Sequence, residues 1–318
     1  MESVPIVDFS AYSLDRDEPD PDLFQKLIDD IYEAFTTIGF VYLKNYDGVL
    51  DEKVDKVYEV TQKFFLFDYE TKMKCEQPKG SYGGFIRVGT QSASQTEDVM
   101  KRPHMDLREG FLFYPPVSQK AWPEGMPELR ENVEDLLLTG KELLHRVLEV
   151  IARGLKYEDP LIFVKSHQKT GTAEGCSSIR LNHYPPTADI EVEEKQVRCG
   201  EHSDYGSITL LFQKDQGGLE ILNRQGQWVS APPIDGTIVV NIGDALQRWS
   251  ADKLLSSKHR VVNPVSESDK RADRYSIIYF GSPDVGTTLE CVDGSNKYPP
   301  INLKEYNEQQ YNKQYNIS

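Results

Sequence analysis

The stretch GEHSDYGSITLL, residues 200–211, joins a His-x-Asp pair to a run of β-branched and aliphatic residues. On an extended strand, side chains at positions i and i+2 point to the same face, roughly 7 Å apart along the chain. His202 and Asp204 can therefore converge on one ion, whereas on a helix the same pair would diverge. The stretch predicts a metal-binding strand that is followed by a second strand over residues 208–212.

The chain around this stretch is rich in short strand candidates. After Asp159-Pro160, helical periodicity gives way to short runs of β-branched and aromatic residues separated by Gly, Pro, Asn and Asp. The predicted strands cover residues 178–184, 208–212, 219–222, 237–242, 259–262 and 274–280. Many short strands at even spacing predict an antiparallel sandwich or barrel, of which the double-sheet jelly roll is one form.

The N-terminal half has a different pattern. Apolar residues recur at spacings of three and four between Phe24 and Phe35 and again over residues 129–155, which predicts two amphipathic helices. Residues 4–9 and 39–43 read as strands. We therefore expect a mainly β fold with flanking helices and a jelly-roll core. The expected organisation is one domain over residues 1–318, with a helix-rich portion at 1–160 and a core at 175–285 that carries the metal site.

Composition narrows the classes of partner. The chain has 318 residues, and 51 acidic against 36 basic side chains give a net charge of −15, which disfavours binding to nucleic acid or anionic membranes. No segment approaches about 18 uninterrupted apolar residues, and the N-terminus has no signal-peptide pattern. The four cysteines form no Cys-x-x-Cys pair, so reduced, buried thiols are expected. These features predict a soluble, cytoplasmic monomer that acts on a small molecule.

A third metal ligand completes the His-x-Asp pair. His259 lies 55 residues after Asp204, at the start of a separate predicted strand. Two imidazoles and one carboxylate on one face of a metal leave the opposite positions open, which suits iron(II) that binds both O2 and an organic chelate. The other four histidines have no such partners and are expected to be structural; they are His104, His145, His167 and His183.

An Arg-x-Ser pair follows the third ligand. Arg274 lies 15 residues beyond His259 and shares a strand face with Ser276. A guanidinium offers paired N–H donors, so together with a hydroxyl it can hold the far carboxylate of a diacid whose other end chelates the metal.

Several segments together resemble a known family. They are VPIVD at 4–8, GFVYLKN at 39–45, RLNHYPP at 180–186, GEHSDYGSITLL at 200–211, NIGD at 241–244, KHRVV at 258–262 and Arg274-x-Ser276. This pattern resembles the isopenicillin N synthase-like branch of the iron(II)/2-oxoglutarate-dependent dioxygenases over nearly the whole chain. Its RYSIIYF run, residues 274–280, is most similar to thymine-7-hydroxylase-type fungal members.

The resemblance implies a double-stranded β-helix in which His202, Asp204 and His259 bind iron and are the catalytic residues. It implies that 2-oxoglutarate and O2 are co-substrates, and that ascorbate is a stimulant. The distal carboxylate of 2-oxoglutarate would be held by Arg274 and Ser276 with help from Tyr184, while Asn182 would lie near the end that chelates iron. The reaction would oxidise an unactivated C–H bond of a small polar or anionic metabolite, by hydroxylation, desaturation or oxidative cyclisation, with succinate and CO2 as co-products.

Four further residues are candidates for binding the primary substrate. Arg180 and Arg87 would supply a second polar anchor, and Tyr205 and Phe280 an apolar wall. The segment from Gly80 to Phe113 matches the family loosely, so the resemblance does not identify the substrate. Within it, Tyr82 and Phe85 are interpreted as core aromatics.

Three other functions remain open from the sequence. An iron oxidase of the same fold would use the Arg-x-Ser pair to bind its substrate's own carboxylate. A zinc hydrolase could use the same metal ligands, although no obvious general base accompanies them and Arg274-x-Ser276 would be unexplained. A non-catalytic jelly-roll binding protein would keep the pocket without consuming oxygen.

Overall fold

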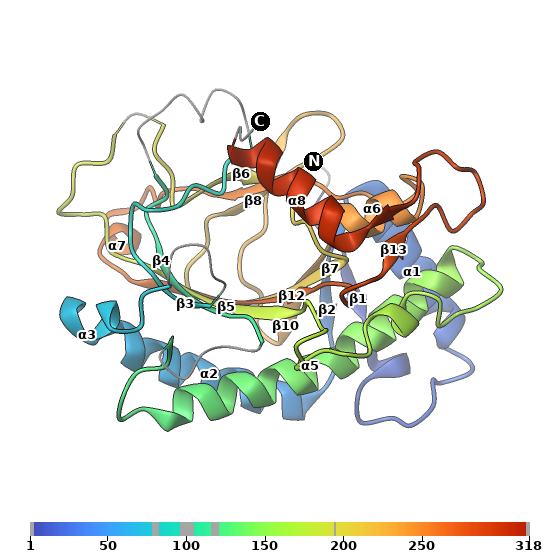
Figure 1. The fold of residues 1–318 in the computed structure, drawn as a ribbon, viewed down its shortest axis with the longest axis horizontal. Helices are drawn as coiled ribbons and strands as arrows, with labels where there is room; N and C mark the ends of the chain where they lie inside the picture. Colours follow the sequence, from blue (N-terminus) through green and yellow to red (C-terminus); the bar gives the residue numbers. More distant parts are fainter. Residues whose placement is uncertain (1–2, 78–82, 96–104, 116–120, 194, 316–318) are drawn as a thin grey trace.

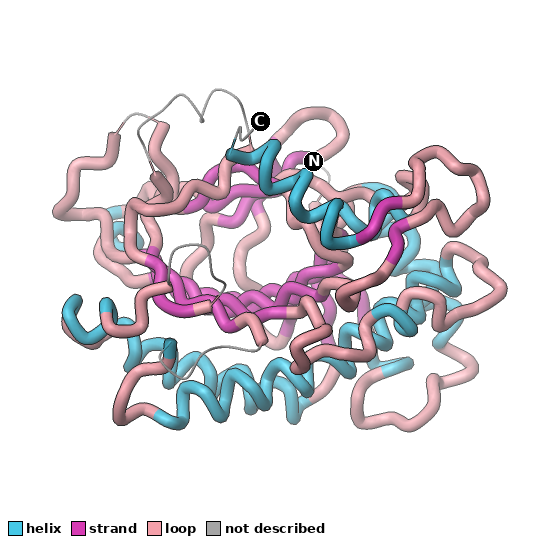
Figure 2. The backbone as a smooth tube through the Cα atoms, in the orientation of Figure 1, coloured by secondary structure: helices cyan, strands magenta, loops and turns pink. Residues whose placement is uncertain are grey.

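Two β-sheets face each other in the computed structural model, which describes residues 3–77, 83–95, 105–115, 121–193 and 195–315 (Figures 1 and 2). The large sheet has the spatial order β1 (Ile6–Asp8), β2 (Phe40–Lys44), β10 (Thr237–Ile242), β7 (Ile208–Gln213), β12 (Arg274–Gly281), β5 (Ser178–Tyr184), β4 (Glu109–Phe113) and β3 (Gly84–Ile86). The small sheet has the order β6 (Cys199–His202), β11 (His259–Val261), β8 (Leu219–Leu222) and β9 (Trp228–Ser230). A separate pair contains β13 (Thr288–Leu289) and β14 (Ile301–Asn302). Apart from the parallel pair β1 and β2, these strands pair antiparallel.

The strands of the large sheet place alternate side chains on opposite faces. Ile277 of β12 belongs to the apolar core beneath the helices, whereas its neighbour Ile278 packs against the apolar cluster between the two sheets. In β7, Leu210 likewise belongs to the apolar core beneath the helices, and Leu211 belongs to the cluster between the two sheets. This period of two fixes which residues face the interior of the jelly roll, because a change of one position moves a side chain to the other face.

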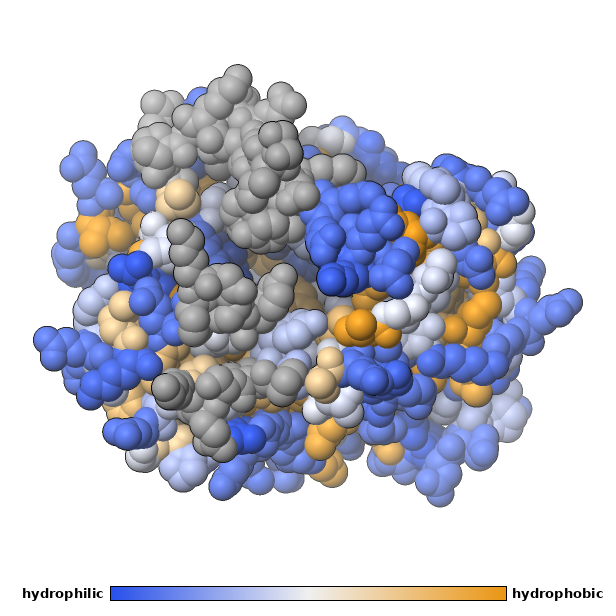
Figure 3. Space-filling view, viewed as in Figure 1, coloured by the Kyte–Doolittle hydropathy of each residue, from blue (hydrophilic) through white to orange (hydrophobic). Residues whose placement is uncertain are grey.

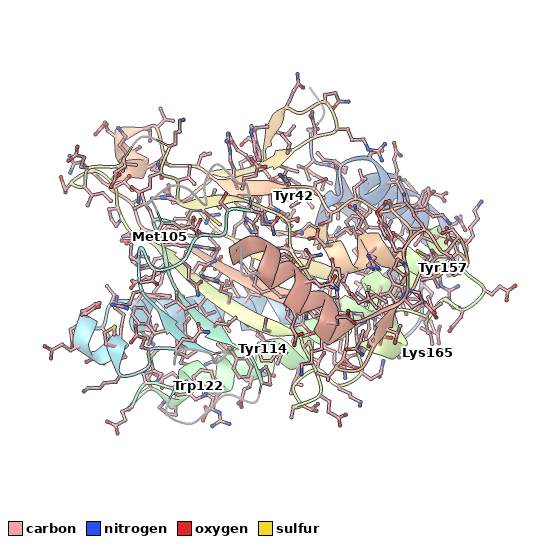
Figure 4. All side chains as sticks on the ribbon, turned by 45° about the horizontal axis from the view of Figure 1, so that its top comes forward. Tyr42, Met105, Tyr114, Trp122, Tyr157 and Lys165 are labelled. Carbon is pink, nitrogen blue, oxygen red and sulfur yellow. The ribbon has the colours of Figure 1, made fainter. Side chains whose placement is uncertain are left out.

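Helices cover the outer face of the large sheet (Figure 1). They are α1 (Phe24–Thr37), α2 (Gly48–Phe65) and α5 (Pro127–Gly154). The long helix α5 packs closely on β12 at Gly140, where a Cβ atom would lie 2.8 Å from the ring of Tyr279. Trp122, labelled in Figure 4, adds to this outer layer by packing on Phe111 and Phe113.

Shorter helices lie at the edges of the two-sheet core. They are the 3-10 turns η1 (Ser10–Tyr12) and η3 (Val164–Ser166) and the helices α3 (Tyr69–Met73), α6 (Asp244–Trp249), α7 (Glu267–Lys270) and α8 (Leu303–Tyr315). Figure 3 shows a hydrophilic surface where α8 lies on this face of the molecule. Its apolar side contributes Leu303 and Tyr306 to the main core.

The mainly β architecture with flanking helices confirms the fold expected from the sequence. The six strands predicted after residue 160 and both predicted helices are present, and α2 is a helix beyond those predicted. Phe85 is a core aromatic with 1 % exposure, whereas Tyr82 and His104 lie outside the described residues. The four cysteines are free and buried. Among the described helices, none has the length and apolarity needed to cross a membrane.

Candidate metal centre

The three predicted metal ligands lie close together at one end of the small sheet, where β6 ends in a turn and β11 begins. His202 ends β6, and Asp204 comes two residues later. His259 begins β11 and stands directly opposite His202 in the antiparallel ladder. The Nε2 atoms of His202 and His259 lie 3.9 and 3.8 Å from Oδ1 of Asp204, and the three ligand atoms are all within 4.8 Å of one another. Strand register therefore brings together residues that are far apart in the sequence.

Hydrogen bonds orient both imidazoles for metal binding. Nδ1 of His202 lies 2.8 Å from the carbonyl oxygen of Gly200, and Nδ1 of His259 lies 3.3 Å from that of Ser257. A protonated Nδ1 that donates to each carbonyl leaves the Nε2 lone pair free for a metal. Burial lowers the pKa of both histidines, and their mutual proximity adds to this for His259, so both rings are held in the neutral form that binds metal.

Two side chains of the large sheet orient Asp204. Its Oδ2 atom accepts hydrogen bonds from Thr209 Oγ1 at 2.7 Å and Asn241 Nδ2 at 2.8 Å, which leaves Oδ1 facing the histidines. Thr209 and Asn241 are cross-strand neighbours on β7 and β10. Burial alone raises the pKa of Asp204, but the two histidines and these two donors lower it below its usual value. The carboxylate is thus held ionised and aimed at the metal position.

We predict that Asn241→Ala weakens iron(II) binding about 10-fold to 100-fold, because groups that orient metal ligands typically contribute that much to affinity. Oδ2 of Asp204 would lose one of its two side-chain donors and Oδ1 would be less well aimed. Anaerobic titration of the metal-free protein with iron(II) measures the effect. Asn132→Ala on α5, whose side chain bonds only a helix carbonyl, is the control. Equal iron affinities for the two variants would contradict the positioning role of Asn241.

The donor set fits iron(II). Two neutral imidazoles and one carboxylate occupy one side of the metal position and leave coordination sites for other ligands, as expected for a non-haem iron(II) oxygenase. No group of three or more other His, Cys, Asp or Glu residues in the described part of the chain is arranged to hold a metal.

The four predicted co-substrate residues lie side by side on β12 and β5. Arg274 pairs with Tyr184, and Ser276 pairs with Asn182, in the antiparallel register. All four point into the interior and are at most 2 % exposed. Nδ2 of Asn182 lies 3.4 Å from Oγ of Ser276. The register therefore brings the polar residues of two sequence motifs into one cluster.

Arg274 is poised to bind an anion in this cluster. Its Nε donates to the carbonyl oxygens of Gln216 and Gly217 at 3.2 and 3.0 Å, and its guanidinium lies 4.6 Å from the ring centre of Tyr184. Its Nη1 atom is buried and has no hydrogen-bond partner among the described residues. Because an unpaired buried donor is costly, this atom marks the position where an acceptor is expected.

The predicted substrate residues divide into two groups. Arg180 lies two positions before Asn182 on the same face of β5, and its Nε donates to Asn182 Oδ1 at 2.9 Å. Phe280 faces the interior opposite Thr209, and Tyr205 directly follows Asp204. These three residues border the metal and co-substrate residues.

Arg87 is not brought to this group. It follows Ile86 of β3 and, by strand alternation, shares the outer side of the sheet with Phe85. Its side chain is 42 % exposed and its Nε lies 2.8 Å from a carboxylate oxygen of Glu76. This placement corrects the expectation that Arg87 faces the iron. Of the two predicted arginines, Arg180 is the one that contacts the co-substrate residues.

Two further interior arginines lie outside the set predicted from the sequence. Arg108, directly before β4, is 8 % exposed and pairs with Asp106 at 3.2 Å. Arg198, directly before β6, is 1 % exposed. Both have an Nε atom without a hydrogen-bond partner in the described part of the chain. Their positions immediately before strands that contribute to the site are the only signal that the sequence carries.

Comparisons with known proteins agree with this geometry. The model of the 2OG-Fe(II) oxygenase superfamily matches residues 175–283, and the model of the non-haem dioxygenase in morphine synthesis N-terminal region matches residues 4–132. A homoarginine-6-hydroxylase of Oryza sativa subsp. japonica is 31 % identical over 92 % of this chain and 89 % of its own length. A 2-oxoglutarate-dependent dioxygenase of Dothideomycetidae sp. is 29 % identical over 99 % of this chain and 98 % of its own.

Two solved structures of 2-oxoglutarate-dependent oxygenases are also similar to this chain. The full-length thymine-7-hydroxylase of Neurospora crassa in complex with α-KG and thymine is 31 % identical, with a TM-score of 0.81 over 96 % of both chains. A 2OG-Fe(II) oxygenase family protein from Caulobacter crescentus is 29 % identical, with a TM-score of 0.79 over 98 % of this chain and 99 % of its own.

Proposed function

Because the chain belongs to the 2OG-Fe(II) oxygenase superfamily, we propose that it oxidises an unactivated C–H bond of a small polar or anionic metabolite, with succinate and CO2 as co-products. The use of iron(II) and 2-oxoglutarate follows from the family. The substrate class and the outcome of the oxidation, whether hydroxylation, desaturation or oxidative cyclisation, are the proposal. It rests chiefly on one observation, the buried guanidinium of Arg180 beside the co-substrate residues, whose hydrogen-bond partners are neutral side chains.

Each group of residues has a distinct task in this proposal. Iron(II) with bound 2-oxoglutarate supplies the oxidising chemistry once O2 is present. His202, Asp204 and His259 hold the metal, while Arg274 and Ser276 hold the co-substrate, with Tyr184 and Asn182 beside them. The chain then places one substrate C–H bond at the open side of the metal and limits access of water.

The charges around the interior favour an anionic substrate. Arg274 is assigned to the co-substrate and Arg108 pairs with Asp106, whereas Arg180 forms no ion pair with a carboxylate among the described residues. Burial and the neighbouring Arg108 lower the pKa of Arg180 to about 10, so it remains charged at neutral pH. Its hydrogen-bond partners there are the neutral side chains of Asn182 and Gln91. A carboxylate on the substrate would balance this charge, and a carbonyl oxygen would satisfy its donors.

Two aromatic residues support a small and partly apolar substrate. Phe280 of β12 lies opposite Thr209, and Tyr205 directly follows the metal ligand Asp204 in the turn after β6. Aromatic walls with a few placed polar groups are typical of small-molecule sites. The Neurospora relative binds thymine in its solved structure, and the rice relative is named for homoarginine; both compounds are small and polar.

We expect Arg180→Ala to raise the KM for the primary substrate about 10-fold or more, because a charged hydrogen bond contributes roughly 1.5–3 kcal/mol. Iron and 2-oxoglutarate affinities should stay within about threefold of wild type. Arg130→Ala, which removes an arginine paired with Glu134 on α5, is the matched control. Parallel losses of iron, 2-oxoglutarate and substrate binding would instead assign Arg180 to the scaffold.

An untargeted assay can identify the substrate. The iron-loaded protein is incubated with 2-oxoglutarate and a fractionated metabolite extract, and products are sought by mass shifts of plus one oxygen or minus two hydrogens. The proposal predicts that the active fraction binds to an anion-exchange resin or contains polar neutral compounds. Turnover confined to apolar neutral compounds would contradict the proposed substrate class.

A further inference from the structure

Arg198 and Arg274 are buried arginines from the two facing sheets, and each contacts the end of β5 or the residue after it. Arg274 begins β12 of the large sheet, and Arg198 immediately precedes β6 of the small sheet. The guanidinium of Arg274 packs on the ring of Tyr184, and Nη2 of Arg198 lies 3.5 Å from the carbonyl oxygen of Pro185, the next residue. Both arginines are 1 % exposed. The two charges therefore both lie at the end of β5, beside Tyr184 and Pro185.

Neither guanidinium forms a direct ion pair with a carboxylate in the described part of the chain. No carboxylate there lies within 4.0 Å of either guanidinium, and both retain a buried N–H donor without a partner, Nε of Arg198 and Nη1 of Arg274. Burial and the proximity of Arg274 lower the pKa of Arg198 to about 10, so the Arg198 guanidinium stays charged at neutral pH and is repelled by that of Arg274. Two buried like charges with free donors are unfavourable unless an anion lies between them.

We propose that Arg198 is a second guanidinium ligand for the distal carboxylate of 2-oxoglutarate, which it binds jointly with Arg274 and Ser276. This inference rests on the 2-oxoglutarate dependence of the family and on the placement of that carboxylate at Arg274. A carboxylate has two oxygens and about four acceptor positions, so it can take donors from both arginines and the serine at once. The co-substrate then links the two sheets.

The arrangement predicts how the chain distinguishes 2-oxo acids. A ligand with the same carbon chain but a terminal methyl group in place of the distal carboxylate, 2-oxovalerate, can chelate the metal equally well but offers nothing to Arg198. Discrimination between 2-oxoglutarate and 2-oxovalerate should therefore depend on Arg198 as well as on Arg274.

The test is anaerobic calorimetric titration of the iron(II)-loaded protein with each of the two acids. Arg198→Met should weaken 2-oxoglutarate binding about 10-fold to 100-fold, the range expected for loss of a charged hydrogen bond, and 2-oxovalerate binding by less than about threefold. Arg198→Lys, which keeps the charge but loses the planar fork, should give an intermediate loss for 2-oxoglutarate. Because both acids are titrated into the same preparation, misfolded protein lowers the number of sites without changing the ratio of affinities.

A matched control variant shows whether the loss of 2-oxoglutarate affinity is specific to Arg198 or follows the loss of any arginine. Arg146 on α5 also donates to backbone carbonyls and packs on a tyrosine ring, that of Tyr12, but it lies in the helical layer. Arg146→Met should leave both affinities unchanged. The inference would be overturned by equal weakening of both acids in Arg198→Met, or by unchanged 2-oxoglutarate affinity. Failure of the wild-type protein to bind 2-oxoglutarate would overturn the co-substrate assignment itself.

Discussion

Replacing His259 by alanine is expected to lower iron(II) affinity by roughly 1,000-fold and to abolish turnover, a larger loss than the 10-fold to 100-fold typical of residues outside the ligand set. The remaining pair, His202 and Asp204, would hold the metal from one side without the imidazole that β11 places opposite β6. Anaerobic iron titration and turnover at saturating 2-oxoglutarate measure the two effects. The fold should persist, because the ring of His259 packs chiefly against Phe40 and His202.

The thermal unfolding temperature supplies an independent readout. A metal that binds only the folded state raises this temperature more the tighter it binds, so iron(II) should stabilise the wild type and leave His259→Ala nearly unchanged. His145→Gln is the control, since its Nε2 bonds the carbonyl of His167 on the helical side of the sheet. Wild-type iron affinity in His259→Ala would show that the third ligand is misassigned.

The second large effect is expected at Arg274. Arg274→Lys should weaken 2-oxoglutarate binding roughly 30-fold or more, because breaking one side of a buried charge pair costs about 2–5 kcal/mol. The Arg274 guanidinium bonds the carbonyls of Gln216 and Gly217 through Nε and keeps Nη1 for the co-substrate, whereas the single nitrogen of lysine would have to reach both positions. Binding is measured by calorimetry on the anaerobic, iron-loaded protein, with iron affinity as the internal control.

The sequence alone left open an iron oxidase that does not use 2-oxoglutarate, and the result at Arg274 would also distinguish the two enzymes. In an oxidase of the same fold, the Arg-x-Ser pair would bind the primary substrate's carboxylate, and the variant would lose substrate affinity while 2-oxoglutarate had no effect. An Arg274→Lys variant that kept wild-type 2-oxoglutarate affinity would contradict the co-substrate site described above.

The parts of the site that could be predicted depend on short-range rules. Arg274 and Ser276 are two residues apart on β12, so strand alternation fixes that they share a face. The same rule predicted that His202 and Asp204 converge; they do, although β6 ends at His202 and Asp204 lies in the turn that follows. Their motifs are also specific enough to identify the family, which in turn implies Tyr184 and Asn182. The structure adds the register between β5 and β12, which places these two pairs side by side.

The parts that could not be predicted depend on pairing between distant strands. Arg87 lies one position beyond the inward-facing Ile86, and a shift of one residue reverses the face, so its sequence position alone could not fix its direction. Arg108 and Arg198 precede strands whose partners are far away in sequence, so their burial is set by tertiary packing. The helix α2, by contrast, could have been predicted from the sequence. Its first turn is preceded by the N-cap residue Asp47, and its apolar residues recur at helical spacing; they are Leu50, Val54, Val57 and Phe64.

Coupling between oxidation of a metabolite and decomposition of 2-oxoglutarate is the property that most defines this site. The most direct measurement is succinate formation by the iron-loaded protein in the presence of the active metabolite fraction, with and without O2. Succinate that requires O2 and rises in proportion to the oxidised product is the predicted result, and His259→Ala should give neither compound. Oxidised product formed at the wild-type rate without 2-oxoglutarate and without succinate would contradict this coupling.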